Sequence, residues 1–217
     1  MKAIWDRDFD QTKVSVVSWI LPQTAETKEK CRAKTNCSTF EWQMVRVHGD
    51  ECNRALAKAL EQYLISLSYA AVAPMCSEQF TWGDSERFSV ISNWSERHTA
   101  HIAGLGTFGL CDALITPLGK AVRIGSVIVN CRLEKTPRLY KSYNEYCFAA
   151  RGCTACIKRC PAGAITPNGH DKAKCRLYHA EVITKICREE YGYNGYSVCG
   201  LCQTGTPCES GIPSVKK

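Results

Sequence analysis

The sequence lacks the features of a membrane or exported protein. None of its apolar runs approaches the roughly 20 residues that a membrane-spanning helix requires. Its start, MKAIWDRDFDQTK, is charged where a secretory signal needs an apolar core. We therefore expect a cytoplasmic protein with no membrane partner.

The chain also lacks a concentrated stretch of basic residues. Its formal net charge is +7, but Lys and Arg are scattered. They form no basic stripe with interleaved aromatic residues of the kind that follows a phosphate backbone. We therefore do not expect nucleic acid as a partner. An acidic redox partner such as ferredoxin or flavodoxin agrees with the charge, because opposite charges steer association.

Cysteine, by contrast, is abundant, with 15 residues in a chain too long for a small secreted disulfide framework. Two spaced runs stand out: C-x2-C-x3-C-P at Cys153, Cys156 and Cys160, and C-x2-C-x5-C at Cys199, Cys202 and Cys208. Cys147 and Cys175 lie outside these runs. Together these eight cysteines match the ligand count of two [4Fe-4S] clusters, each bound by four thiolates.

The spacing also predicts which cysteines share a cluster. In two-cluster ferredoxins the cysteine that precedes proline ligates the other cluster. We therefore assign one cluster to Cys147, Cys153, Cys156 and Cys208, and the other to Cys160, Cys175, Cys199 and Cys202. A zinc ribbon is the alternative, because paired C-x2-C groups also bind zinc. It would use only four of the eight cysteines. Exposed clusters favour a low-oxygen, anaerobic cell.

The segment before the cysteine runs predicts a small α/β core. Buried strands are expected over 14–21, 70–75, 113–117 and 121–130, and helices over 50–69, capped by Asp50, and over 94–103. The polar segments 24–36 and 77–93 are predicted to be loops, and the second could line a pocket. We expect two domains, an α/β domain over 1–140 and a cluster domain over 141–217.

A glycine motif lies inside this core. Gly104, Gly106 and Gly109 match G-x-G-x-x-G, but a dinucleotide site needs a preceding strand, a following helix and a later acidic residue. Here a helix precedes the motif and a strand follows it. The nicotinamide interpretation therefore fails, and we expect a loop whose backbone approaches another group closely.

The stretch AGLGTFGLCDALITPLGKAVRIGSVIVN, followed by the double cysteine motif, resembles the epoxyqueuosine reductases and the reductive dehalogenases. The resemblance implies a nitroreductase-like α/β domain that binds cobalamin, and a ferredoxin-like domain whose two clusters pass electrons to cobalt. The family's glycines carry over to Gly104, Gly106 and Gly109, and its cluster ligands to the eight cysteines. If the glycine loop lies over the corrinoid ring, Cys111 faces the pocket, as a cobalt ligand or as a packing residue.

The chain departs from the family pattern at several positions. The family's Lys-Asn pair is Leu110-Cys111 here, and the position of its catalytic aspartate falls on Val90. The catalytic residue is therefore unknown, with proton-donor candidates at Tyr140, Tyr143, His98, His101 and Asp84. Five residues separate Cys147 from Cys153, more than is usual in the family. The chain also ends without the family's tRNA-binding helical tail, so we do not expect epoxyqueuosine as the substrate.

Two functions fit these features. The first is an iron–sulfur oxidoreductase that passes electrons through two [4Fe-4S] clusters to a corrinoid (cobalamin) or a small substrate at the α/β domain. The alternative is a ferredoxin-type electron-transfer protein without a corrinoid. We favour the first, because an electron carrier does not require the ordered α/β domain over residues 1–140.

Overall fold

The computed structural model describes residues 10–86 and 89–214. The charged first residues, on which the prediction of no secretory signal rests, and Phe88 of the predicted loop lie outside this part. The fold is mixed α/β, as predicted. The chain forms two compact units, which we call the sheet unit (Met1–Leu21, Asp50–Leu105 and Arg123–Leu139) and the cysteine unit (Pro22–Gly49, Gly106–Val122 and Tyr140–Lys217).

A three-stranded sheet forms the centre of the sheet unit. Its strand order is β1 (Val14–Pro22), β7 (Val122–Asn130) and β2 (Ala71–Val72), and β2 runs antiparallel to β7 with Ala71 opposite Val129. The β-branched residues of the two long strands explain this choice of structure, because such side chains suit a pleated, half-buried surface. The predicted strands over 14–21 and 121–130 are confirmed. The strand predicted over 70–75 is confined to the two residues of β2, because Pro74–Cys76 form a 3₁₀ turn.

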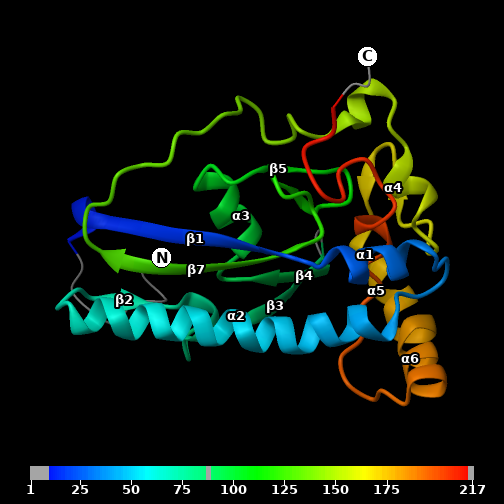
Figure 1. The fold of residues 1–217 in the computed structure, drawn as a ribbon, viewed down its shortest axis with the longest axis horizontal. Coiled ribbons are helices and arrows are strands. Elements are labelled where there is room, and N and C mark those ends of the chain that lie inside the picture. Colours follow the sequence, from blue (N-terminus) through cyan, green and yellow to red (C-terminus); the bar gives the residue numbers. More distant parts are fainter. Residues whose placement is uncertain (1–9, 87–88, 215–217) are drawn as a thin grey trace. The chain divides into compact units, whose positions relative to one another are not determined.

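Two helices cover the opposite faces of this sheet (Figure 1). Within helix α2 (Phe40–Ser66), Ala57, Leu60 and Leu64 pack with Val127 and Val129 of β7. On the other face, beside α3 (Glu96–Ile102), the Trp94 indole N–H donates to the Ser126 hydroxyl over 3.1 Å. Because successive side chains of a strand alternate between faces, β7 serves both layers.

Three predictions on residues 24–93 were wrong. Helix α2 begins at Phe40, so Asp50 lies inside it and pairs with Arg123 at 3.4 Å instead of capping its start. The predicted loop over 24–36 contains helix α1 (Ala25–Arg32), because the Thr24 hydroxyl accepts a bond from the Thr27 N–H and caps that helix. The predicted loop over 77–93 contains the hairpin of β3 (Trp82–Ser85) and β4 (Ser89–Ser92).

The cysteine unit is built from short elements joined by turns. Besides α1 and residues 40–49 of α2, it holds the hairpins β5 (Thr107–Phe108) with β6 (Leu114–Ile115) and β8 (Ile165–Thr166) with β9 (Gly169–His170), and the helices α4 (Ala155–Lys158), α5 (Lys172–Tyr178) and α6 (Thr184–Tyr191). A π-helical turn, His179–Ile183, joins α5 to α6. The strand predicted over 113–117 is confirmed as β6.

Side chains from α2 hold these short elements in place. The buried Trp42 packs with Cys31, Ala121 and Leu201. The buried Gln43 amide donates to the carbonyl of Val198 over 2.7 Å and accepts from its N–H over 2.8 Å. Such contacts matter because hairpins and helices this short are not stable alone. In the described part of the chain, no helix is long and apolar enough to cross a membrane.

Close packing in the sheet unit yields a stability prediction at Gly125. A Cβ atom at Gly125 would lie 2.5 Å from both the Trp19 ring and the Asn53 carbonyl oxygen, and these two side chains share a 2.8 Å hydrogen bond. We expect Gly125→Ala to lower the free energy of unfolding by about 1–3 kcal/mol, because overpacking displaces this pair.

The matched control is Gly83→Ala, where the nearest atom would be an ordinary 3.6 Å away. Urea unfolding of both variants measures the difference. Equal stability of Gly125→Ala and the parent protein would contradict the packing described.

Candidate metal centre

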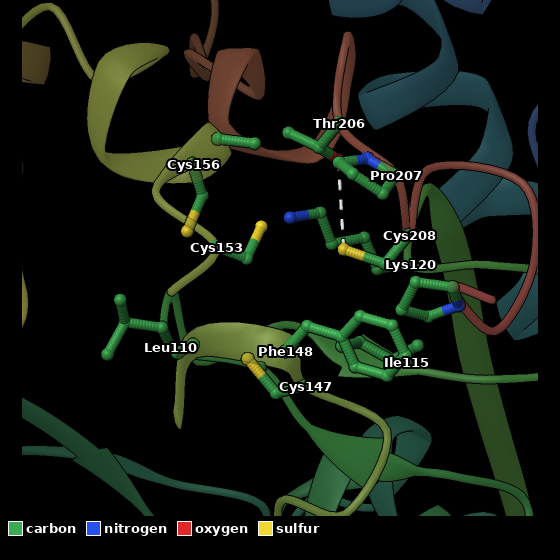
Figure 2. A pocket seen from close by; sticks show the side chains of 14 residues that line it. Leu110, Ile115, Lys120, Cys147, Phe148, Cys153, Cys156, Thr206, Pro207 and Cys208 are labelled. Atoms are coloured by element: carbon green, nitrogen blue, oxygen red, sulfur yellow. Dashed lines mark hydrogen bonds between the residues drawn. The ribbon is translucent and has the colours of Figure 1, made fainter. Parts of the chain in front are cut away.

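Four cysteines line one cavity of the cysteine unit, and we call them the first cysteine group: Cys147, Cys153, Cys156 and Cys208. The cavity is open to solvent on one side. Figure 2 shows the four side chains around this space, together with Phe148, Ile115 and Lys120. The sequence predicted that these four cysteines share a cluster, and the fold brings them together from two distant segments.

Local turns position the first group. Cys147 precedes the 3₁₀ helix Phe148–Arg151, and Gly152 ends it with a left-handed φ of 86°. The Cys153 N–H then donates to the Phe148 carbonyl over 3.0 Å, which places Cys153 just before α4, the helix that carries Cys156. The longer spacing between Cys147 and Cys153 is therefore occupied by a helical turn.

The other four predicted ligands form the second cysteine group: Cys160, Cys175, Cys199 and Cys202. Burial, together with the nearby thiols of Cys175 and Cys160, raises the pKa of Cys199 to about 12. The Cys160 sulfur accepts a bond from the Ala164 N–H over 3.3 Å. These contacts place Cys160, Cys175 and Cys199 near one another.

Two histidines lower the pKa of Cys175, unlike that of Cys199. Hydrogen bonds from His170 and His179 lower the pKa of Cys175 to about 6. His170 is held in turn by Asp112, with 3.2 Å between its Nδ1 and the carboxylate, and this contact raises the pKa of His170 to about 9. Cys175 is therefore stabilised as a thiolate, which is the form that binds metals.

Arg159 ties the segments that carry both groups. Its guanidinium donates to the carbonyls of Thr204 over 3.1 Å, Lys34 over 2.8 Å and Cys31 over 3.2 Å. Arg159 directly precedes Cys160, and Thr204 lies between Cys202 and Cys208. One side chain therefore joins the two cysteine-bearing segments to the end of α1.

The donor set of the first cysteine group matches an iron–sulfur cluster in the number and kind of its ligands. A tetrahedral zinc site needs four ligands within about 2.0–2.3 Å of one point. A [4Fe-4S] cubane instead takes one thiolate at each of four irons, which matches sulfurs spread around a cavity. The first group therefore fits an iron–sulfur cluster.

The predicted cofactor residues make close contacts within the chain. A Cβ atom at Gly106 would clash with the Ile115 carbonyl, so this glycine lets the backbones of β5 and β6 meet. Gly109 also faces Ile115, and Gly104 faces Pro137. Cys111 is buried beside Cys156, and its sulfur lies 3.6 Å from the Lys120 amine. Its thiol therefore faces the cysteine groups.

The candidate proton donors are dispersed. Tyr140 is buried and Tyr143 is exposed, while His98 contacts the Ser95 hydroxyl at 2.7 Å and His101 lies on the same short helix. Asp84 lies in β3 directly opposite Val90 of β4. Sequence reasoning missed Lys120, a buried cation that lines the cavity. In the sequence, only its position after the Leu118-Gly119 turn could have indicated a role for Lys120.

Comparisons with known proteins support the predicted resemblance. No protein-family model matches the chain. It is 31% identical to the epoxyqueuosine reductase of Bacillus cereus over 123 residues, which is 54% of this chain and 30% of the relative. The enzyme of the same name from Leadbetterella byssophila is 34% identical over 112 residues, or 50% of this chain and 35% of the relative. The matches thus span about a third of these relatives.

Two solved structures of epoxyqueuosine reductases align with most of this chain. A crystal structure of epoxyqueuosine reductase with a tRNA-Tyr epoxyqueuosine-modified stem loop aligns with 93% of this chain and 50% of its own, at 18% identity and a TM-score of 0.49. The structure from Streptococcus thermophilus aligns at 18% identity with a TM-score of 0.47, over 93% of this chain and 51% of its own. The predicted resemblance to epoxyqueuosine reductases, which are oxidoreductases, is confirmed by the curated relatives.

The prediction against nucleic acid as a partner is contradicted by that tRNA stem-loop complex. The prediction relied on the scatter of Lys and Arg along the sequence. Phosphate contacts depend on which charges meet on the folded surface, and residues far apart in the sequence can meet there. A scattered sequence pattern therefore does not exclude a nucleic-acid partner.

The histidine contacts of Cys175 predict its reactivity in the iron-free chain. Because its pKa is lowered to about 6, the reactive thiolate should form as the pH rises through about 6 and be lost below it. Alkylation by iodoacetamide, followed by peptide mass spectrometry across this range, measures the midpoint. His170→Asn removes the main hydrogen bond and should move the midpoint upward.

The control His48→Asn changes a histidine of α2 and should leave the midpoint in place. A midpoint near the ordinary thiol value of 9.0 in the parent chain would show that the histidines do not act on Cys175.

Proposed function

We propose that the chain is an iron–sulfur oxidoreductase with two [4Fe-4S] clusters, which delivers electrons to a corrinoid or a small substrate at the sheet unit. The observation that carries the proposal is the gathering of Cys147, Cys153, Cys156 and Cys208 around one cavity. Four thiolates are the ligand set of one such cluster. The names of the curated relatives support a reductase.

The residues of the chain have separate tasks in this proposal. Bound clusters supply one-electron transfer at potentials set by their surroundings. The first cysteine group holds one cluster and the second group holds the other. Phe148, Leu110 and Ile115 line the first site with apolar groups, which limits the access of water. Arg159 keeps the two cysteine-bearing segments together.

The sheet unit is the proposed place of the electron acceptor. We propose a nitroreductase-like core for it and a ferredoxin-like arrangement for the cluster-bearing segment 141–217, to which the cysteine unit adds residues 22–49 and 106–122. Gly104, Gly106 and Gly109 are the proposed cofactor loop. The surroundings of Cys111 support a place beside the clusters. Ferredoxin or flavodoxin is the proposed electron donor.

A ferredoxin-type electron carrier is the second candidate. Both cysteine groups lie within the cysteine unit, so the clusters need no ligand from the sheet unit. A carrier without a corrinoid would therefore use the same cysteines. The two functions differ in whether the reduced chain acts on cobalamin.

The first substrate to test is epoxyqueuosine in tRNA, because the curated relatives are named for its reduction. We propose Asp84 as the proton donor for this reaction. Residues directly opposite in an antiparallel pair point to the same face of the sheet. Asp84 pairs with Val90, the position where the resemblance places the family's acid. The carboxyl group thus lies one strand away from the expected position.

Cys153→Ser tests the cluster assignment and electron delivery together. Anaerobically purified parent protein should hold about eight irons, and the variant about half as many, because one cubane loses a ligand. Dithionite-reduced parent protein should change the absorption spectrum of added cobalamin as cobalt is reduced, and the variant should do so at least tenfold more slowly. Iron analysis and stopped-flow absorption measure the two effects.

The matched control is Cys52→Ser, which alters an exposed cysteine of α2 and should behave like the parent protein. Full iron content in Cys153→Ser would contradict the ligand assignment. A parent protein with eight irons that leaves the cobalamin spectrum unchanged would favour the electron carrier.

Asp84→Asn tests the proposed proton donor. We expect epoxyqueuosine reduction in tRNA to slow by about 10²–10⁴-fold, the usual contribution of a general acid, while the iron content stays that of the parent protein. The control Glu86→Gln neutralises an exposed acid two residues further along the chain. Product analysis of digested tRNA by mass spectrometry measures the rates. Equal rates for Asp84→Asn and Glu86→Gln would assign proton donation to another group.

A further inference from the structure

Lys120 is a buried cation surrounded by cysteines. Only 3% of the residue is exposed, and it lines the cavity of the first cysteine group. Its amine lies 3.6 Å from the Cys111 sulfur. Figure 2 shows the amine end of Lys120 reaching the space between the Cys153 and Cys208 side chains.

A backbone clamp fixes the place from which this side chain extends. The Lys120 N–H donates to the Cys208 carbonyl over 2.9 Å. Gly119 has a left-handed φ of 87°, and a Cβ atom there would clash with the Glu209 carbonyl. The Glu209 side chain is held in turn by Arg32 at 2.6 Å and by the Gly205 N–H at 2.6 Å. Lys120 is therefore attached to the segment that carries a predicted ligand.

The surroundings of Lys120 contain thiols and no carboxylate. No Asp or Glu lines the cavity, and within residues 10–86 and 89–214 no salt bridge involves Lys120. The neighbouring thiols are those of Cys111, Cys208, Cys202 and Cys156. A buried ammonium group without an anion is costly, so these thiols, as thiolates, are the groups that can supply its counter-charge.

We propose that Lys120 is a positioning residue that raises the reduction potential of the cluster held by the first cysteine group. This inference rests on the proposed function. Reduction adds one negative charge to the cluster, and a fixed cation in a poorly solvated site stabilises that charge. Net charge and hydrogen bonds to sulfur are known determinants of cluster potentials. Two thiols of the first group, Cys208 and Cys156, are neighbours of the cation, against one of the second group, Cys202, so the potential of the second cluster should shift less.

The experiment is an EPR-monitored redox titration of the anaerobically purified chain. The signal that Cys153→Ser removes identifies the cluster of the first group. Lys120→Met should lower the midpoint of that cluster by at least 59 mV, which is a tenfold change in a one-electron equilibrium, and should shift the other cluster less than half as far. Lys120→Arg keeps the charge and should return the midpoint toward that of the parent protein.

The matched control is Lys28→Met, which removes another buried lysine of the same unit, one that donates to the Ser210 hydroxyl over 2.8 Å. It should leave both midpoints in place. If Lys120→Met fails to assemble its clusters, the parent protein labelled with ¹⁵N-lysine supplies the answer. Pulsed EPR of the reduced cluster should then show coupling to a lysine nitrogen, which Lys28→Met retains.

Two results would overturn the inference while leaving the proposed function intact. They are unchanged midpoints in a Lys120→Met protein that holds both clusters, and no lysine coupling in the labelled parent protein. A parent protein with no cluster signal at all would instead remove the proposed function, and the inference with it.

Discussion

The cysteine unit depends on holding sulfurs from distant parts of the chain around one space. Cys147, Cys153 and Cys156 belong to one segment, and Cys208 comes from another. Arg159 joins these segments through carbonyls of Thr204 and Lys34. The clamp between Lys120 and Cys208 adds a second tie. Because the secondary structures here are short, these polar contacts between segments carry the arrangement.

The sequence predicted well those features that follow from local patterns. The β-branched runs of β1 and β7 form the sheet. The four cysteines that the spacing grouped line one cavity, and that they share a cluster stays a prediction. Helix α1 was missed because polar residues dominate its segment. The early start of α2 was missed although half of residues 40–49 are apolar. The buried side chains of these two helices contact residues such as Leu201 and Val198, which are remote in the sequence.

The features that the sequence could not predict depend on pairing across the fold. The hairpin of β3 and β4 places Asp84 opposite Val90, although no spacing rule joins the two. Likewise, the sequence around Lys120 indicates an ordinary lysine in a turn, yet the residue is buried among thiols. The chemical roles proposed for Asp84 and Lys120 depend on neighbouring residues that only the folded chain brings close.

Two [4Fe-4S] clusters bound by the eight cysteines are the basis of the proposed electron transfer. Metal and sulfide analysis of the parent protein, isolated without oxygen and combined with Mössbauer spectroscopy, measures them. We expect about eight irons and eight acid-labile sulfides per chain, in two cubane clusters, with no zinc. One or two zinc ions per chain without sulfide would show that the cysteines bind zinc instead.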